Sequence, residues 1–423
     1  MSENTGSTKN TDVVVIGGGY AGVMAANRLT LRGDVAVTLV NPRPSFVHRV
    51  RLHQLVGGTG EAVVEYRKVL NGRVRLVVDT AVRIDAAGRT VTLADGGTVG
   101  YDYLVYAVGS GSAGPRVPGA AEFALPLASL EEAERLRPAL GAAPATAGVV
   151  VVGGGPTGIE TAAELAEAGR AVTLACGGAL GPYLHPRGRR SVARRLARLG
   201  VTVLDGPGTR VTAVTRDAVR LADGRELPSA VTVWTAGFGV PDLAARSGLS
   251  TDALGRLLTD ETLTSVDDPR VVAAGDSAAP SCLPLRMSCQ AAIPLGARAA
   301  DTVLARIAGE RPGPLRELFA GQCVSLGRHD GIFQFARDDT AMWFHIDGGP
   351  GAKLKETVCA GVVKHLAGEA AEPGSYRLHR LPGGTRRRRL LRAGEAELAP
   401  APLREKDRGA DALREGADGR SRA

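Results

Sequence analysis

The sequence predicts an α/β fold with two Rossmann-like domains and a small α+β domain near its C-terminal end. Two observations lead to this fold. A glycine-rich turn between an apolar strand and a helix occurs twice, about 135 residues apart. The elements that follow each turn also come in the same order, which indicates a duplicated unit.

The first turn has the sequence VVVIGGGYAG, with glycines at Gly17, Gly19 and Gly22. The first of these allows a tight turn out of the strand, and the third lets the helix pack closely on it. A side chain at Gly19 would collide with a pyrophosphate, so a glycine there lets the backbone approach one. The pyrophosphate would then lie at a helix N-terminus, where the helix dipole favours negative charge.

The second turn, VVVVGGGPTG, repeats this arrangement with Gly153, Gly155 and Gly158. One such turn also occurs as an ordinary buried turn between a strand and a helix, but two in one chain favour two dinucleotide sites. A chain that holds two dinucleotides most simply passes electrons from one to the other.

The other elements of the first half follow from local patterns. Residues 12–40 read as strand, helix and strand, and residues 74–99 alternate as short β-strands. Residues 102–108 form another buried strand. A capping residue and early acidic residues predict a helix over 129–140, and the segment 115–126 reads as a linker.

The pattern then restarts with strand 149–152. The expected elements of this second unit are helix 156–168, strand 171–175, a helix at about 187–199, strands 201–204, 209–215 and 218–221, and a closing strand 231–235. Residues 271–274 return to the first domain. We therefore expect a first domain from 1–125 and 255–310, a second from 126–254, a C-terminal domain at 311–392 and a disordered tail at 393–423.

The composition limits the possible functions. The chain has 423 residues, a net charge of +8 and five cysteines, none in a CxxC pair. No spacing of ligands predicts a metal site, and no signal peptide or membrane-spanning run is visible, so a cytoplasmic protein is expected. The basic clusters at 187–195 and 386–389 read as solvated helix faces, and no motif supports nucleic-acid binding.

These residues resemble the pyridine nucleotide–disulfide oxidoreductases, the flavoproteins with two dinucleotide sites, and within them the type II NADH dehydrogenases. Four segments in the family's order carry the resemblance over about residues 12–310: VVVIGGGYAGVMAANRL, TVGYDYLVYAVGS, GVVVVGGGPTGIETAAELA, and RVVAAGDSA followed by MSCQAA.

The resemblance implies that FAD binds at the first turn, through Gly17, Gly19 and Gly22. It also places Ala107 and Gly109 beside the flavin, and Gly275 and Asp276 near the ribityl and pyrophosphate groups. A helix beginning at Gln290 and Ala291 would direct its N-terminus at the flavin and stabilise the reduced, anionic ring.

By the same resemblance, NADH or NADPH would bind at the second turn, through Gly153, Gly155 and Gly158. The segment that ends at Gly237 would form a wall beside the nicotinamide. Glu160 matches the family's acidic residue near the nicotinamide, although an exposed acid that complements the helix dipole would read the same way.

The chain departs from the family's patterns in three ways. First, it lacks the CxxxxC pair of the disulfide reductases, so it should not be one. Second, Asn41 and Cys176 stand where an acidic residue ends the second strand of each domain. Asn41 can still accept a hydrogen bond from the FAD ribose. Cys176 no longer repels a 2′-phosphate, and Arg187 and its neighbours follow, so NADH and NADPH both stay open.

Third, Pro294 and Leu295 replace the glutamines that follow Gln290 in quinone-reducing relatives. No amphipathic C-terminal membrane helix is visible either. These two differences predict weak activity toward long-chain quinones and a membrane association that is absent or peripheral. His53 and His48 could supply protons near the flavin, or be partly exposed helix residues.

The function implied is an FAD-dependent NAD(P)H oxidoreductase, with Glu160, Gln290 and His53 as the candidate catalytic residues. Its acceptor is unidentified and would be a small molecule, with specialised metabolism as one setting. The alternatives are a type II NADH:quinone oxidoreductase, a ferredoxin-type reductase, and a non-catalytic flavoprotein that senses NAD(P)H. The oligomeric state is open, with a homodimer as one option.

Overall fold

The first sheet is parallel and is built from two distant parts of the chain. In this computed structural model, which describes residues 10–316, 319–377 and 384–393, its order is β21-β9-β1-β2-β5. These strands are β1 (Thr11–Ile16), β2 (Val35–Asn41), β5 (Arg75–Val78), β9 (Tyr103–Tyr106) and β21 (Val271–Ala273). The return of residues 271–273 to this sheet confirms the prediction from sequence.

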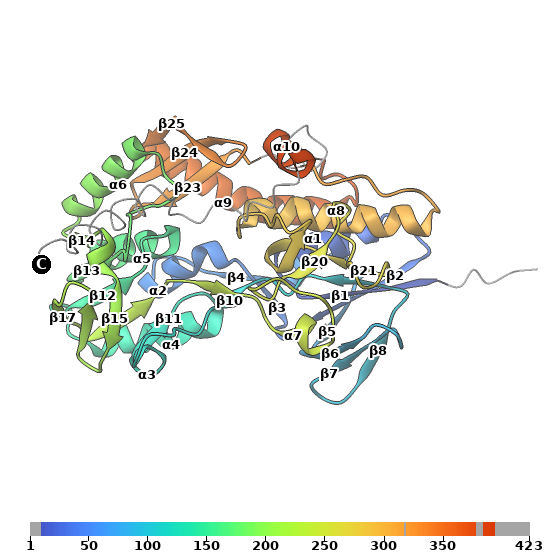
Figure 1. The fold of residues 1–423 in the computed structure, drawn as a ribbon, viewed down its shortest axis with the longest axis horizontal. Helices are drawn as coiled ribbons and strands as arrows, with labels where there is room; N and C mark the ends of the chain where they lie inside the picture. Colours follow the sequence, from blue (N-terminus) through green and yellow to red (C-terminus); the bar gives the residue numbers. More distant parts are fainter. Residues whose placement is uncertain (1–9, 317–318, 378–383, 394–423) are drawn as a thin grey trace, which may run out of the picture.

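Two different layers cover the faces of this sheet (Figure 1). Val13 and Val15 pack with α1 (Tyr20–Leu29), α8 (Cys289–Ile307) and α9 (Gly348–Ala371) in one core. The alternate residues Val14 and Ile16 pack against an antiparallel meander of β6 (Ala81–Asp85), β7 (Thr90–Leu93) and β8 (Thr98–Gly100). Alternation in a β-strand explains why one apolar run supplies both cores.

The second sheet repeats this plan, in the order β11-β18-β12-β13-β14. Its strands are β11 (Ala124–Pro126), β12 (Val149–Val152), β13 (Val172–Ala175), β14 (Thr202–Leu204) and β18 (Val231–Trp234). It packs on α4 (Leu130–Ala142), α5 (Pro156–Glu167) and α6 (Pro186–Arg198), and on a meander of β15 (Val211–Val214), β16 (Ala218–Leu221) and β17 (Glu226–Pro228). The segment 115–126 is therefore not only a linker, because β11 forms the edge of this sheet.

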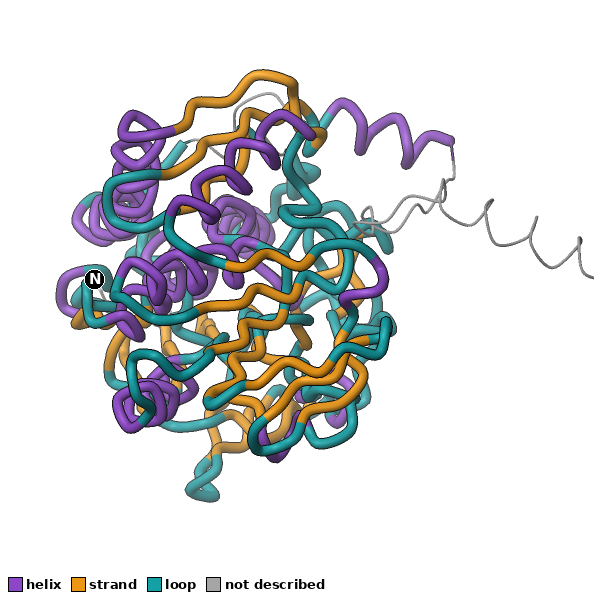
Figure 2. The backbone as a smooth tube through the Cα atoms, turned by 90° about the vertical axis from the view of Figure 1, so that its left-hand side faces the viewer, coloured by secondary structure: helices purple, strands orange, loops and turns teal. Residues whose placement is uncertain are grey.

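The C-terminal region adds an antiparallel sheet of β23 (Gly321–Ser325), β24 (Gly331–Arg337) and β25 (Thr340–Asp347), with α9 after it. In Figure 2, α10 (Thr385–Ala393) leaves the upper edge of the molecule near this sheet. Within the described ranges, no helix is both long and apolar enough to cross a membrane. The predicted disordered tail lies almost wholly outside the described residues.

Shorter elements connect these units. They are β3 (Ser45–Val47), η1 (Arg49–Arg51), α2 (Leu52–Gly57), β4 (Val63–Glu65), η2 (Tyr66–Lys68), β10 (Gly111–Ser112), α3 (Ala120–Phe123), η3 (Pro207–Thr209), β19 (Phe238–Gly239), α7 (Leu243–Arg246), β20 (Leu257–Thr259), η4 (Gly275–Ser277) and β22 (Ala278–Pro280). The antiparallel pair β10 and β19 joins the two Rossmann-like units.

Candidate functional site

The first glycine turn is tightly packed at Gly17, Gly18 and Gly22 but open at Gly19. Gly17 has a φ of 101°, and a Cβ there would collide with the carbonyl oxygen of Ala107. A Cβ at Gly22 would collide with the carbonyl oxygen of Gly17. At Gly19, the N-cap of α1, a Cβ would have no heavy atom within 4 Å. The open space at the N-terminus of α1 is where the sequence places a pyrophosphate.

Asn41 braces this turn from the end of β2. Its Oδ1 accepts the backbone N–H of Gly18 at 2.9 Å, and its Nδ2 donates to the carbonyl oxygen of Arg43 at 2.8 Å. The Tyr66 hydroxyl donates to the carbonyl oxygen of Gly18 at 2.8 Å. Asn41 therefore holds the shape of the turn, and its Oδ1 keeps one lone pair for a further donor.

The other residues predicted for this site lie around the same end of the sheet. Ala107 continues from β9 and donates its N–H to the carbonyl oxygen of Ile16 at 2.9 Å. Gly109 and Gly275 both have positive φ values, 70° and 72°. Asp276 follows β21 and accepts the Ser110 hydroxyl at 2.7 Å.

The N-terminus of α8 completes this group. Ser288 caps the helix by accepting the N–H of Ala291 at 3.2 Å. In the described part of the chain, the buried Oε1 of Gln290 has no hydrogen-bond partner. An orphaned buried acceptor, an open helix N-terminus and a glycine cradle together fit a bound FAD.

The second turn has the same geometry. Gly153 has a φ of 124°, and a Cβ at Gly158 would collide with the carbonyl oxygen of Gly153. A Cβ at Gly155, the N-cap of α5, would again meet nothing within 4 Å. Trp234 donates its Nε1–H to the carbonyl oxygen of Ala236 at 2.8 Å, and this hydrogen bond holds the segment that ends at Gly237.

Two of the arginines that follow Cys176 in sequence, Arg189 and Arg187, already have partners within the protein. The Nε of Arg189 donates to the carbonyl oxygens of Gly181 and Leu184, and Arg187 lies over the ring of Trp343. Burial, together with the nearby carboxylate of Asp205, raises the pKa of the Cys176 thiol to about 12. These contacts leave the choice between NADH and NADPH open.

Glu160 and His53, two of the candidate catalytic residues, meet in a buried network. Glu160 Oε1 lies 2.8 Å from the Nζ of Lys355 on α9, and its Oε2 lies 3.6 Å from the Nδ1 of His53 on α2. Ser325 on β23 donates its N–H to Glu160 at 3.0 Å, and its hydroxyl lies 3.1 Å from the Nε2 of His53. The first, second and C-terminal domains thus each contribute to one polar cluster.

Burial and charge set the protonation states in this network. Burial lowers the pKa of His53 to about 4, so its imidazole is neutral near pH 7. Burial alone would raise the pKa of Glu160 and lower that of Lys355. Their mutual attraction outweighs this, so the pKa of Glu160 lies below its usual value and that of Lys355 well above.

The structure corrects the alternatives considered for these residues. Glu160 is 6% exposed, so it is not a surface acid of the helix dipole. His53 is on a helix as expected but is buried, and His48 precedes η1 rather than lying within a helix. His48 accepts from or donates to the Tyr20 hydroxyl at 3.1 Å, and burial lowers its pKa to about 4.

The sequence analysis missed Lys355 and Ser325. One signal was available for the lysine, because it shares a helical stripe with Cys359, Val362 and Leu366, all buried on α9. A lysine on an apolar stripe is rare enough to indicate a buried partner. Nothing in the sequence pattern around Ser325 indicates its contact with His53.

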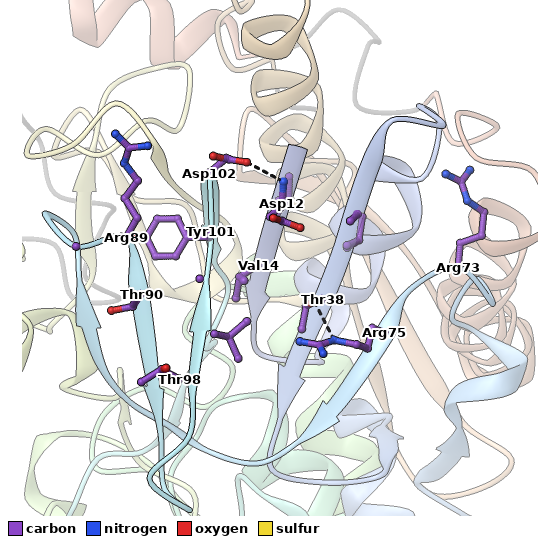
Figure 3. A pocket seen from close by; sticks show the side chains of 16 residues that line it. Asp12, Val14, Thr38, Arg73, Arg75, Arg89, Thr90, Thr98, Tyr101 and Asp102 are labelled. Carbon is purple, nitrogen blue, oxygen red and sulfur yellow. Dashed lines mark hydrogen bonds between the residues drawn. The ribbon is translucent and has the colours of Figure 1, made fainter. Parts of the chain in front are cut away.

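A large hollow of about 670 Å³ is not part of this site (Figure 3). It lies beside the N-terminal half of β1, away from the glycine turn that follows the strand. Two pairs of its lining residues are hydrogen-bonded to each other, since Asp102 accepts the N–H of Asp12 at 3.0 Å and Arg75 donates to the Thr38 hydroxyl at 3.3 Å, whereas the buried Tyr101 hydroxyl has no partner among the described residues. Because the hollow lies away from both glycine turns, we assign no cofactor to it.

Comparisons with known proteins agree with this geometry. The sequence model of the pyridine nucleotide-disulphide oxidoreductases matches residues 11–296. The NADH dehydrogenase-like protein Rv1812c of Mycobacterium tuberculosis is 34% identical over 324 residues, which cover 70% of this chain and 80% of that protein. The type II NADH:quinone oxidoreductase Ndh of the same organism is 28% identical, with coverage of 76% and 78%.

Among solved structures, the sulfide:quinone oxidoreductase of Aquifex aeolicus superposes with a TM-score of 0.73 at 20% identity, and the match covers 92% of this chain and 99% of that one. This likeness supports the arrangement of two dinucleotide-binding domains and a C-terminal region.

Proposed function

We propose an electron acceptor for this chain on the premise that it belongs to the pyridine nucleotide-disulphide oxidoreductase family and is an FAD-dependent NAD(P)H oxidoreductase. The acceptor is an organic molecule that takes up protons together with two electrons, as a quinone ring does. When bound, FAD supplies the redox chemistry by accepting two electrons from NAD(P)H and passing them on.

The two turns would hold the two nucleotides. Gly19, with the N-terminus of α1, would hold the FAD pyrophosphate, and Gly155, with the N-terminus of α5, would hold that of NAD(P)H. Asp276 and the N-terminus of α8 at Gln290 would contact the FAD. This assignment is supported by the open space at Gly19 and Gly155, and by the Oε1 of Gln290, which has no hydrogen-bond partner among the described residues.

The buried Glu160–Lys355–His53 network carries the proposal about the acceptor. A buried ion pair costs desolvation free energy, and well-packed apolar residues would stabilise the fold as well or better. Lys355 carries a proton 2.8 Å from Glu160, and His53 continues the chain of exchangeable groups to Ser325. Because Lys355 keeps its proton near pH 7, such a network can present a charged hydrogen-bond donor to the oxygen of an acceptor that gains negative charge as it is reduced.

This network distinguishes the proposed function from its alternatives. A ferredoxin takes up one electron and no proton, so a ferredoxin reductase has no need of buried proton donors. A non-catalytic sensor of NAD(P)H has no need of them either. The sequence argument against a quinone was based on the missing glutamines after Gln290 and on the absence of an amphipathic C-terminal membrane helix. Lys355 offers a different donor to an acceptor oxygen, which answers the first of these two points.

Lys355→Met tests this proposal. We expect anaerobic bleaching of the flavin by NADH to stay unchanged, because the second turn is untouched. Turnover with menadione should fall by about a hundredfold, which is typical of losing one donor to an oxygen that gains negative charge. Turnover with ferricyanide, which takes electrons without protons, should change less than about twofold.

Two further variants make this test decisive. Lys353→Met, on the exposed side of the same helix, should turn over both acceptors like the wild type. The double variant Lys355→Met/Glu160→Gln removes both charges, so a loss confined to menadione there cannot come from an unpaired buried carboxylate. Equal losses with both acceptors, or none, would contradict the proposal.

A further inference from the structure

Three glutamates of α5 lie on one face of that helix and lead from the buried network toward the surface. Glu160, Glu164 and Glu167 follow one another at spacings of four and three residues, which places them on the same side of the helix. Their side chains are 8%, 1% and 25% exposed. This set is called the glutamate row below. Its inner end pairs with Lys355, and its outer end reaches solvent.

Helix α2 of the first domain packs along one side of the glutamate row. His53 lies beside Glu160, and one turn later a Cβ at Gly57 would meet the Cγ of Glu164 at 2.5 Å. Thr59 follows α2, is exposed, and donates its hydroxyl hydrogen to the Oε1 of Glu164. Figure 1 shows α2 beside α5. The buried Glu164 is therefore connected to solvent through a single hydroxyl group.

The turn between β23 and β24 covers the other side of the row. Arg328 donates its backbone N–H to Glu167, and its Nη1 lies 4.0 Å from the Oε2 of Glu164. That distance is too long for a hydrogen bond, and within the described ranges the buried Oε2 has no hydrogen-bond partner. A carboxylate oxygen that is buried without a partner destabilises the fold, so a role in function is the better reason for it.

Glu164 and Glu160 lie in opposite electrostatic environments. Burial raises the pKa of Glu164 above its usual value, and the two other carboxylates of the row add to this rise. The Thr59 hydroxyl and Arg328 act in the opposite direction without cancelling it. Burial acts in the same way on Glu160, but the charge of Lys355 outweighs it, so the pKa of Glu160 lies below its usual value. Glu164 is thus the carboxylate of the pair that more readily takes up a proton.

We propose that Glu164 is the residue through which protons from solvent enter the buried Glu160–Lys355–His53 network. A proton would be taken up beside Thr59 and pass from Glu164 to Glu160 and His53. Side chains one turn apart on a helix lie about 6 Å from each other, and one bridging water can span that gap. Glu164 would contact neither cofactor nor acceptor, so it would act only through the network.

The proton balance of the reaction requires such a route, and this inference rests on the proposed function. In each turnover NAD(P)H, one solvent proton and the oxidised acceptor yield NAD(P)+ and an acceptor that has gained two electrons and two protons. The hydride of NAD(P)H supplies both electrons and one of the protons. The second proton must cross from solvent to the acceptor oxygen, and the glutamate row provides the path.

Glu164→Gln tests the route, because it keeps the size of the side chain but removes the acidic proton. Turnover of the holoenzyme with menadione should fall by about a hundredfold, the lower end of what a positioned proton donor contributes. Anaerobic bleaching of the flavin by NADH should stay unchanged, since hydride transfer takes up no solvent proton. Formate at about pH 5.5 should restore turnover at least about fivefold relative to a bulky buffer, because a small acid can replace the lost carboxyl.

Two matched variants accompany this test. Glu164→Asp keeps a carboxyl group and should turn over menadione within about threefold of the wild type without formate. Glu134→Gln removes an exposed carboxylate of α4 and should behave like the wild type with and without formate. A merely structural role for Glu164 would give a loss that formate does not restore.

Infrared spectroscopy gives a readout that does not depend on turnover. The wild type, titrated from pH 8 to pH 5, should gain the C=O band of a protonated carboxyl that Glu164→Gln lacks. Thr59→Val leaves this carboxyl in place but removes its hydrogen bond, so the band should shift in that variant. The measurement therefore remains informative even if Glu164→Gln is unstable.

Three results would overturn the proposal: wild-type turnover of menadione by folded Glu164→Gln, a loss that formate does not restore, or no band that depends on Glu164. Failure of the proposed function gives a different pattern. If Lys355→Met loses menadione turnover and Glu164→Gln does not, the acceptor stands and only the proton route falls. If Lys355→Met loses nothing, the acceptor falls, and a formate-restored loss in Glu164→Gln would still support the route.

Discussion

Substitutions at Gly19 and Gly155 can show which nucleotide binds at which glycine turn. Gly19→Val would place a side chain in the open space before α1, where FAD is expected, and so should abolish FAD binding. Gly155→Val fills the corresponding space before α5. It should leave FAD bound but block bleaching of the flavin by NADH or NADPH.

The absorbance spectrum of each purified variant, before and after addition of NADH, checks this pair of predictions. A folded Gly155→Val protein that lacks FAD would show that the two turns have been assigned the wrong way round.

His53 links the stability of the fold to pH. Its pKa is about 4 in the folded protein, because burial disfavours the charged imidazole, and about 6.5 in the unfolded chain. The unfolded state therefore binds the proton more readily. The free energy of unfolding should not depend on this group above pH 6.5, and should fall by about 2 kcal/mol between pH 7 and pH 5.

Urea unfolding of the wild type and His53→Gln at both pH values tests this prediction. Between pH 7 and pH 5, the free energy of unfolding of the variant should fall by about 2 kcal/mol less than that of the wild type. Exposed His329→Gln is the matched control and should behave like the wild type. A variant with the full pH dependence would show that His53 is not the group responsible.

The residues of the glycine turns could be predicted from sequence because each obeys a local rule. A positive φ or a close approach of two backbones allows only glycine, whatever the rest of the chain does. Lys355 obeys no such rule. Its partner Glu160 comes from another domain, and only the completed fold brings the two together.

At the scale of elements, the packing of α1 on α8 positions the first turn. Gly296 lies where the two helices touch, and a Cβ there would collide with the carbonyl oxygen of Ala21. Gly296→Ala should therefore push the helices apart, destabilise the fold by about 1–3 kcal/mol and weaken FAD binding.

Gly361→Ala, on α9 with nothing within 4 Å of the new Cβ, is the matched control for this change. It should stabilise the fold by up to about 1 kcal/mol, because alanine is the better helix former. Thermal unfolding and FAD titration compare the two variants, and equal stabilisation by both would refute the packing argument.

The elements predicted with least ambiguity were those with strong periodicity and clear ends. The helix expected at 129–140 is α4, which begins after Ser129 with a capping box to Glu132. The strand β11 was missed because the three prolines of the segment 115–126 indicate a loop. It is an edge strand of three residues, where a missing N–H costs little.

At the scale of the whole molecule, the five cysteines remain free thiols and form no relay. Cys282 is exposed, whereas burial raises the pKa of Cys289 to about 12 and that of Cys323 to about 11. Iodoacetamide should therefore modify Cys282 first, and NADH oxidation should continue at its original rate.

Mass spectrometry of the alkylated protein, together with an activity assay, checks this expectation. Loss of flavin reduction at one alkyl group per chain would show that a thiol takes part after all.

The return of β21 to the first sheet also determines the order in which the molecule can be assembled during translation. The second Rossmann-like unit is contiguous, so it can fold as soon as β18 has left the ribosome. The first unit is made earlier but must wait, because β21 and α8 are still unsynthesised. Until then the face of α1 that packs on α8 lacks this partner, and it stays exposed for well over a hundred residues of synthesis.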